Sequence, residues 1–330
     1  MDPRPILPLL LYSLDHTSAR LERIEVFLRR NRLPDASFDL SPTFMQLKAV
    51  PVLSNLKALL LSLEIGEGAG HLRMPFDRNY VSKAGDRAFP RLKDFLSHTP
   101  LLEHLRLNFD QREQPSWCTE AFLTWLGASP GPDIDTVPAP VTLDHLTTLD
   151  LGMIHAAPRT LVALVSKFVK LEALSLWKVT LQTARDNPDV LEPDDSCLWA
   201  YYLRKLSEAV PAPEGIKTLM IGWTTEYANN RLEPLPVRFV DRSKVDDKEN
   251  STRESFEDVI TYRKEVGSDL CAWLVELSKR ASLPPMIESV SSEASDDENE
   301  DDDDDEDDSN DGDDDDDEEV HLNESDDDGS

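Results

Sequence analysis

The sequence has few cysteines and no apolar run long enough for a membrane helix. Its three cysteines, Cys118, Cys197 and Cys271, stand far apart in 330 residues, a spacing that fits neither a disulfide framework nor a zinc site. The apolar run Ile6–Leu14 contains Pro8 and is shorter than the roughly 20 residues that cross a bilayer. It also lacks the basic lead and the small-residue cleavage site of a signal peptide. We therefore expect an intracellular protein, cytoplasmic or nuclear, with no membrane segment.

Motifs for catalysis and for cofactor binding are also missing. The sequence contains neither G-x-S-x-G nor H-E-x-x-H, which mark common hydrolases and zinc proteases. The glycine-rich segment 66–70 fails as a dinucleotide loop, because the sixth position of that fingerprint is His71 rather than glycine. No two of the seven histidines stand at ligand spacing with a third ligand beside them. A triad built from distant positions stays open, but we predict a protein that is not an enzyme and holds no cofactor or metal.

The end of the chain has no lysine or arginine. From Glu293 to Ser330 there are 25 Asp and Glu residues, which leaves 34 basic and 40 acidic residues over positions 1–292. Most of the formal net charge of −31 therefore belongs to this end. A segment that repels itself and has little apolar surface does not pack, so we predict a disordered acidic tail over 286–330. Ser295 and Ser325 each precede three acidic residues and are predicted targets of an acidophilic kinase.

Two interpretations of the acidic tail remain open at this stage. A polyacid can bind basic proteins such as histones, with an affinity that falls as salt rises. The tail can equally be a solubilising appendage with no dedicated partner. Because the rest of the chain is slightly acidic and has no basic stripe, we predict no direct binding to DNA or RNA.

One apolar phrase recurs through the body of the chain. The pattern L-x-x-L-x-L, with Ile allowed, occurs five times with these middle residues: Leu59, Leu105, Leu149, Leu174 and Leu219. The intervals are 46, 44, 25 and 45 positions, and apolar residues from 161 to 168 show helical spacing between the closest two copies. A strand, a helix and a second strand in this period are typical of leucine-rich repeats, whose units must stack to bury their leucines. A weaker copy surrounds Ile24, where the apolar spacing fits a helix as well as a strand.

These patterns predict an α/β fold over residues 1–285. We expect an irregular leucine-rich-repeat solenoid, horseshoe-like, followed by the disordered acidic tail. Helices are predicted near the start of 89–110, over 117–126 and over 197–210. The proline-rich segments 129–140 and 186–195 are predicted loops. A last amphipathic helix within 269–283 is expected to cover the open end of the repeats.

The register of the repeated phrase predicts a surface for partner binding. The leucines of L-x-L point into the core, and the residues between them point outward. Among these outward positions, seven have side chains that suit a contact surface: His104, Arg106, Asn108, Asp150, Ser175, Trp177 and Met220. Leu60 and Ser62 of the first strand are expected on the same surface. Trp177 could instead pack against an inserted loop, and a one-residue error in register would move the whole set to the other face.

Two protein families resemble this arrangement. The segments FLSHTPLLEHLRLNF (95–109) and LVALVSKFVKLEALSLWKVTL (161–181) are similar to the C-terminal leucine-rich region of fungal F-box proteins, over roughly residues 20–285. That resemblance implies a monomeric, non-enzymatic interaction module that selects partners with its repeats. Cullin ubiquitin-ligase components or their substrate are the implied partners, although residues 1–50 show no three-helix F-box pattern.

The alternative family is the acidic leucine-rich nuclear phosphoproteins, in which a tail follows compact and regular repeats. It implies binding of histones or other basic proteins through the tail. The intervals of 44 to 46 positions depart from the near-constant repeat length of that family.

Overall fold

The computed structural model describes residues 6–15, 17, 20–26, 32–40, 50–65, 88–110, 117–130, 138–183, 195–209, 215–227, 233–240 and 256–284. The chain forms two units, Met1–Pro285 and Met286–Ser330, and every described residue belongs to the first. The predicted acidic tail with Ser295 and Ser325, the glycine segment 66–70 and most of the two proline-rich segments lie outside the described residues.

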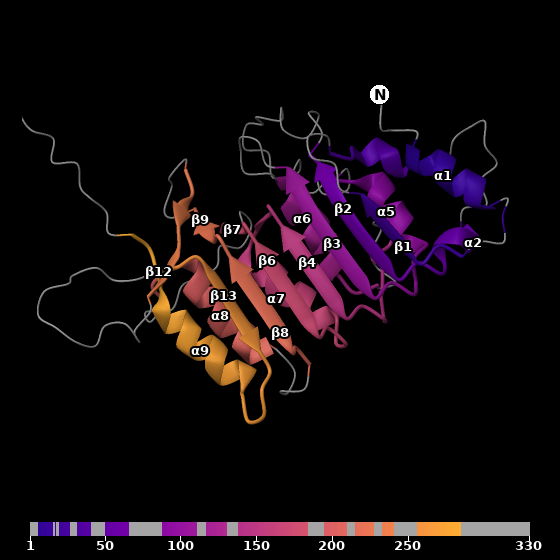
Figure 1. Ribbon diagram of the computed structural model, residues 1–330. Coiled ribbons are helices and arrows are strands. Elements are labelled where there is room, and N and C mark those ends of the chain that lie inside the picture. Colours follow the sequence, from indigo (N-terminus) through magenta and orange to yellow (C-terminus); the bar gives the residue numbers. More distant parts are fainter. Residues whose placement is uncertain are drawn as a thin grey trace, which may run out of the picture. The chain divides into compact units, whose positions relative to one another are not determined.

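A seven-stranded sheet is the centre of the first unit (Figure 1). Its strands, in spatial order, are β1 (Arg23–Val26), β2 (Ala58–Glu64), β3 (His104–Asp110), β4 (Thr148–Gly152), β6 (Ala173–Trp177), β8 (Thr218–Gly222) and β13 (Val259–Arg263). Neighbouring strands are parallel except for β13, which pairs antiparallel with β8. The predicted mixed α/β class is confirmed, and the spatial order of these strands is also their order in the sequence.

Each copy of the repeated phrase forms one strand of this sheet. The middle residues pair in sequence across the sheet, Leu59 with Leu105, then Leu149, Leu174 and Leu219. All five are buried. The weak first copy is also a strand, because Ile24 pairs with Leu59. The competition between helix and strand at that position is therefore decided in favour of the strand.

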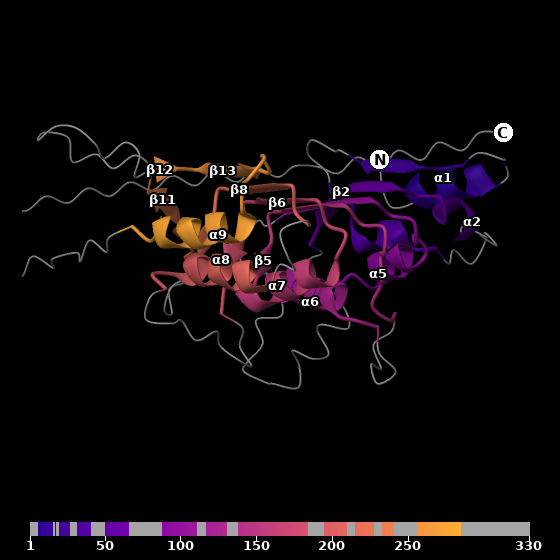
Figure 2. The ribbon, with the colours of Figure 1, turned by 90° about the horizontal axis from the view of Figure 1, so that it is seen from below.

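Helices cover one face of the sheet (Figure 2). They are α5 (Pro90–Ser97), α6 (Trp117–Gly127), α7 (Pro158–Lys167), α8 (Leu198–Ala209) and α9 (Leu270–Arg280). The predicted helices within 89–110, 117–126, 197–210 and 269–283 are thus confirmed. At the N-terminal end lie α1 (Ile6–Asp15), the 3-10 helix η1 (Asp35–Phe38) and α2 (Val50–Leu53). None of the helices in the described ranges is long and apolar enough to cross a membrane.

A second, smaller sheet follows the carboxyl ends of three central strands. It contains β5 (His155–Ala156), β7 (Thr180–Leu181), β9 (Thr225–Glu226) and β10 (Leu235–Pro236). The chain bends into it through Met153, Lys178 and Trp223, whose φ angles are 53°, 54° and 55°. The N–H group of each of these residues donates a hydrogen bond across to the neighbouring strand. The acceptors are, in the same order, the carbonyl oxygens of Trp177, Gly222 and Asp258, each at 2.8 Å. A left-handed conformation costs energy for non-glycine residues, and these hydrogen bonds offset part of that cost.

Carboxylates from neighbouring elements satisfy the helix N-termini. Asp35 of η1 accepts hydrogen bonds from the N–H groups of Arg91 and Leu92 in α5, at 3.3 and 3.0 Å. Glu120 of α6 accepts from Ala157 N at 2.7 Å, at the start of α7, and Glu226 of β9 accepts from Trp199 N of α8 at 3.1 Å. The first N–H groups of a helix lack partners within the helix and favour a negative charge. The capping carboxylates therefore join each helix to an adjacent element.

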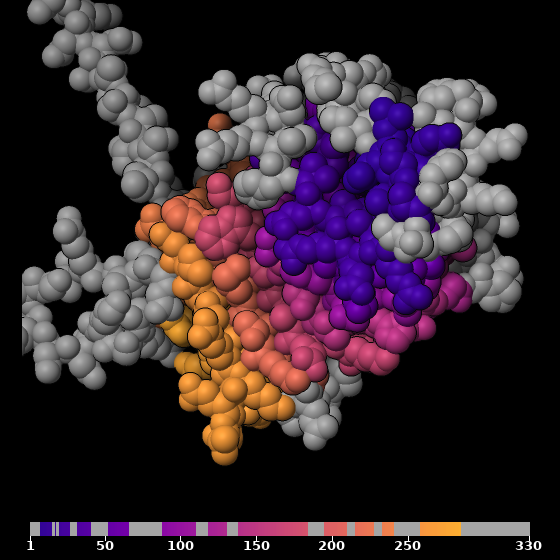
Figure 3. Space-filling model, turned by 45° about the vertical axis from the view of Figure 1, so that its right-hand side comes forward, coloured from indigo at the N-terminus to yellow at the C-terminus, as the bar shows by residue number. Residues whose placement is uncertain are grey.

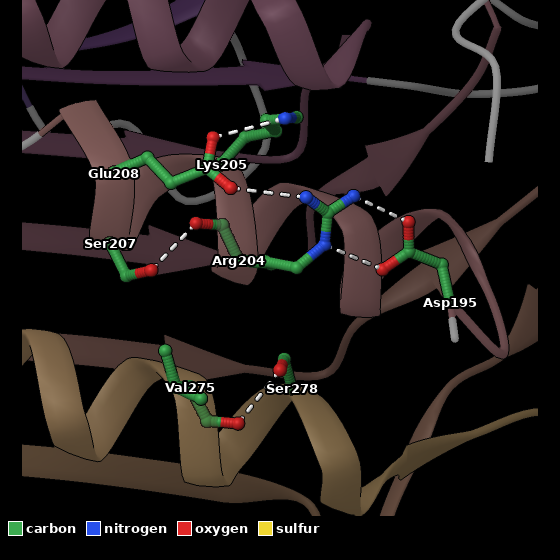
Figure 4. A network of polar contacts seen from close by, with 7 residues as sticks. All are labelled: Asp195, Arg204, Lys205, Ser207, Glu208, Val275 and Ser278. Carbon is green, nitrogen blue, oxygen red and sulfur yellow. Dashed lines mark hydrogen bonds and ion pairs between the residues drawn. The ribbon is translucent and has the colours of Figure 1, made fainter. Parts of the chain in front are cut away.

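The C-terminal end has two features that the sequence pattern does not indicate. The strand β13 lies beyond segment 229–253, where no repeat is visible. A third sheet joins β11 (Arg238–Val240), β12 (Phe256–Glu257) and β14 (Ala281–Ser282). Helix α9 packs beside α8 at this end, and the α8 side of that region carries a network centred on Arg204 (Figure 4).

Candidate functional site

The face of the sheet opposite the helices, here named the open face, carries the predicted contact residues. The register places them in three rows that run across the strands. The first row is Arg23, Ala58, His104, Thr148, Ala173, Thr218 and Arg263. The second is Glu25, Leu60, Arg106, Asp150, Ser175, Met220 and Thr261. The third is Ser62, Asn108, Gly152, Trp177, Gly222 and Val259. All seven predicted contact residues thus share one face, and the strand register inferred from the sequence is confirmed.

Two residues of the first phrase differ from the expectation. Leu60 and Ser62 occupy outward positions in the register but are only 4% and 2% exposed. The prediction that they form part of an accessible surface is therefore wrong, because an outward position in a strand is accessible only where nothing covers it. The open face is therefore buried at these two positions of β2, while Arg23 and Glu25 of β1 are exposed.

A cluster of three polar side chains lies at the centre of the open face. Asp150 of β4 meets His104 Nε2 at 2.9 Å and Arg106 Nε at 3.0 Å, both on β3. Burial raises the pKa of the Asp150 carboxyl, but the hydrogen bond from His104 and the charge of Arg106 outweigh it, so the pKa lies below its usual value. The carboxylate is therefore ionised and fixed in place, and it holds the two basic side chains in one arrangement before any partner arrives.

The shifted pKa of Asp150 predicts a pH-dependent contribution to stability. Because the folded-state pKa is lowered, this contribution is complete above the unfolded value of about 3.9 and is lost as pH falls through the folded value. We expect the stability advantage of the native chain over Asp150→Asn, measured by urea unfolding, to be constant near neutrality and to shrink below about pH 4. An advantage that stays unchanged in acid would contradict the ionised cluster.

Glycines make room for the two largest side chains at the end of the open face. A Cβ atom placed on Gly222 would lie 2.6 Å from Cζ3 of Trp177, and one on Gly152 would lie 2.0 Å from Oδ1 of Asn108. The indole therefore lies across the backbone of β8, and the Asn108 amide lies across that of β4. Trp177 is partly exposed, and it packs on a neighbouring strand of the same face. An aromatic ring supported in this way is a large contact surface with little conformational freedom left to lose.

A groove lies beyond the carboxyl ends of β4, β6 and β8, beside the second sheet. Its volume is about 510 Å³, and its lining is Met153, Lys178, Thr180, Trp223, Thr224, Thr225, Pro236, Val237, Arg238 and Asp258. Trp223 is half exposed and stands at the end of β8. Sequence reasoning missed this groove, although a signal exists: Met153, Lys178 and Trp223 each stand two positions after the last apolar residue of their phrase. Trp177 and Trp223 bring two aromatic side chains to the same end of the open face.

The described residues offer little for catalysis or metal binding. They contain no group of three or more His, Cys, Asp or Glu side chains that could hold a metal ion. His155 is buried, which lowers its pKa to about 4, and its neighbours Thr119 and Tyr227 form no arrangement with a nucleophile and a base. Burial raises the pKa of the Cys197 thiol to about 12, so this sulfur is a poor nucleophile.

No family model matches the sequence, and no curated protein matches it.

Proposed function

We propose that the chain is a non-enzymatic protein-interaction module that binds a partner through the open face of its sheet. The observation that carries this proposal is the arrangement of that face. A fixed cluster of His104, Arg106 and Asp150 lies beside a supported tryptophan, Trp177. Arginine and tryptophan are the residue types that contribute most to protein interfaces when they are held rigidly in place. Asn108, Ser175 and Met220 complete the proposed contact surface.

The finer architecture that we propose is an irregular leucine-rich-repeat solenoid. Three features support it. Each copy of the apolar phrase forms a parallel strand in register with the next. The helices lie on the face of the sheet opposite the open face. A residue with a left-handed backbone conformation recurs directly after β4, β6 and β8. Repeat proteins of this kind commonly bind partners on the surface formed by their stacked strands.

We further propose that the module acts like the substrate-selecting half of an F-box ubiquitin-ligase adaptor. What supports this is the resemblance of segments 95–109 and 161–181 to that family, together with strands in which each predicted contact residue points away from the core. Partners would then be cullin-ligase components or the ligase substrate, and the expected compartment is cytoplasmic or nuclear.

The test compares binding by the native chain with binding by Trp177→Ala. Partners captured with the native chain are identified, and their affinity for each purified variant is then measured by calorimetry. Because loss of a central tryptophan typically costs 2 kcal/mol or more, we expect the dissociation constant to rise by about 30-fold or more. The matched control is Val169→Ala, which removes a side chain that is 70% exposed outside the open face. Equal affinities for the native and Trp177→Ala chains would refute binding by the open face.

The alternative function is the binding of histones or other basic proteins by the acidic tail. The 25 acidic residues from Glu293 onward favour it. A chain that ends at Pro285 distinguishes the two proposals, because open-face binding survives this truncation at moderate salt. Tail binding is lost on truncation, and in the full chain it weakens steeply as salt rises. Phosphorylation of Ser295 or Ser325 would strengthen tail binding by adding negative charge.

A further inference from the structure

The outer edge of β13 has backbone groups that pair with no other described residue. Thr218 N donates to the carbonyl oxygen of Glu172, on the β6 side, so Leu219 and Ile221 direct their backbone groups toward β13. Those two residues pair with Tyr262 and Ile260. By alternation, Val259, Thr261 and Arg263 direct their N–H and C=O groups outward.

The β13 edge lacks two features that often protect an edge strand, a proline and a β-bulge. Its five residues, Val259 to Arg263, include no proline, its register with β8 runs without a bulge, and Val259 is 42% exposed. At the opposite edge of the sheet, β1 has only four residues, two of which, Arg23 and Glu25, form an ion pair of 2.6 Å. Short length and charge are common defences against unwanted strand pairing. Of the two edge strands of this sheet in the described ranges, β13 is the longer.

Contacts behind the strand hold β13 in place before anything pairs with it. The Tyr262 ring packs against Trp273 of α9 with ring centroids 5.2 Å apart, and the Tyr262 hydroxyl lies 3.0 Å from Ser268 Oγ. The C-terminal elements, orange in Figure 3, lie along one side of the described residues. A strand that is already extended and fixed loses little conformational freedom on pairing.

We propose that β13 pairs with β13 of a second copy of this chain, antiparallel and about a twofold axis at Thr261. This inference departs from the monomer that the family resemblance implies, goes beyond the proposed partner recognition and does not depend on it. In this register Thr261 faces Thr261 of the other copy, and Val259 faces Arg263, so every outward N–H and C=O of the three residues finds a partner. The two seven-stranded sheets then form one continuous sheet.

The charges of β13 favour this occupant over an arbitrary extended peptide. The twofold register sets the exposed Asp258 of each copy opposite the exposed Lys264 of the other, and opposite charges across a strand pair are stabilising. No like charges meet within residues 258–264, and threonine pairs are favourable at facing positions. A twofold contact of one strand with itself also closes at two copies, so it predicts a dimer rather than a fibre.

The test measures self-association of the full chain by sedimentation equilibrium over a wide concentration range. The buffer contains about 0.15 M salt, which screens repulsion between acidic segments beyond about 8 Å. We expect a reversible monomer–dimer equilibrium. Thr261→Pro removes the N–H of both central residues and should weaken dimerisation about tenfold or more. Thr261→Val, which keeps the N–H and suits a strand, should dimerise like the native chain.

Charge exchange supplies a second test that does not depend on how proline affects folding. Asp258→Lys alone and Lys264→Asp alone should each weaken the dimer severalfold, and the double variant should restore it, because only the facing charges are exchanged. Circular dichroism of each variant checks that the fold is intact. A chain that stays monomeric at every concentration overturns the proposal. A dimer indifferent to all these variants, or a series of larger species, also overturns it.

Discussion

Replacing Arg204 with alanine is expected to lower the free energy of unfolding by about 3–5 kcal/mol. The guanidinium makes two hydrogen bonds to Asp195, Nε to Oδ1 at 3.1 Å and Nη2 to Oδ2 at 2.7 Å (Figure 4). The Asp195 side chain is only 3% exposed. Truncation of Arg204 takes both of these hydrogen bonds and a positive charge away from a buried carboxylate, a change that is strongly destabilising in buried ion pairs. Urea unfolding followed by circular dichroism measures the loss.

Two further variants identify the cause of that loss. Glu208 also accepts a hydrogen bond from Arg204, at 3.1 Å, but its side chain is 53% exposed. Because exposed ion pairs contribute little, Glu208→Gln should cost less than about 1 kcal/mol. Adding Asp195→Asn to Arg204→Ala removes the buried negative charge and should recover part of the stability. If the double variant is no more stable than Arg204→Ala alone, the loss comes from packing and not from the charge.

The second large effect is expected from Leu174→Ala in β6. Leu174 is 2% exposed and pairs in register with Leu149 on one side and Leu219 on the other. Truncation leaves a cavity between the sheet and the helices, and such cavities cost about 2–5 kcal/mol. The same unfolding experiment measures the change.

Leu101→Ala is the matched control, since it removes the same atoms from a leucine that is 40% exposed. Surface changes of this kind usually stay within about 0.5 kcal/mol. Similar losses for Leu101→Ala and Leu174→Ala would show that the repeated leucines are not the core of the unit.

The strands and their register follow from the sequence because each depends on a local pattern. Alternation of apolar and polar residues determines which side chains face the core, and five copies of one phrase align without further information. This is why Arg106, Asp150 and Trp177 could be placed on one face before the structure. The same reasoning fails at Leu60 and Ser62, because burial at an outward position depends on segments that are distant in the sequence.

The groove and the last strand were not predicted, for physical reasons that can be named. The bends at Lys178 and Trp223 require a positive φ at residues that seldom adopt it, so no glycine signals the turn. Strand β13 has no copy of the leucine phrase, and its pairing partner is 37 to 45 positions away, as the pairs Gly222–Val259 and Thr218–Arg263 show. The cluster of His104, Arg106 and Asp150 was foreseen as three surface residues, but the contact among them depends on side-chain geometry.

The order of strands in the main sheet has a consequence for how the chain is made. Strands leave the ribosome in the order in which they stand side by side, and none of the paired residues in that sheet is further apart than Ala58 and His104, 46 positions. Each new strand therefore pairs with a strand that has already been synthesised. This order suits folding during synthesis, because domains begin to fold from the N-terminal side. The growing edge of the sheet thus moves on with each strand, and β13 arrives last, so a chain released before Arg263 would leave backbone groups of Leu219 and Ile221 on β8 without their partners.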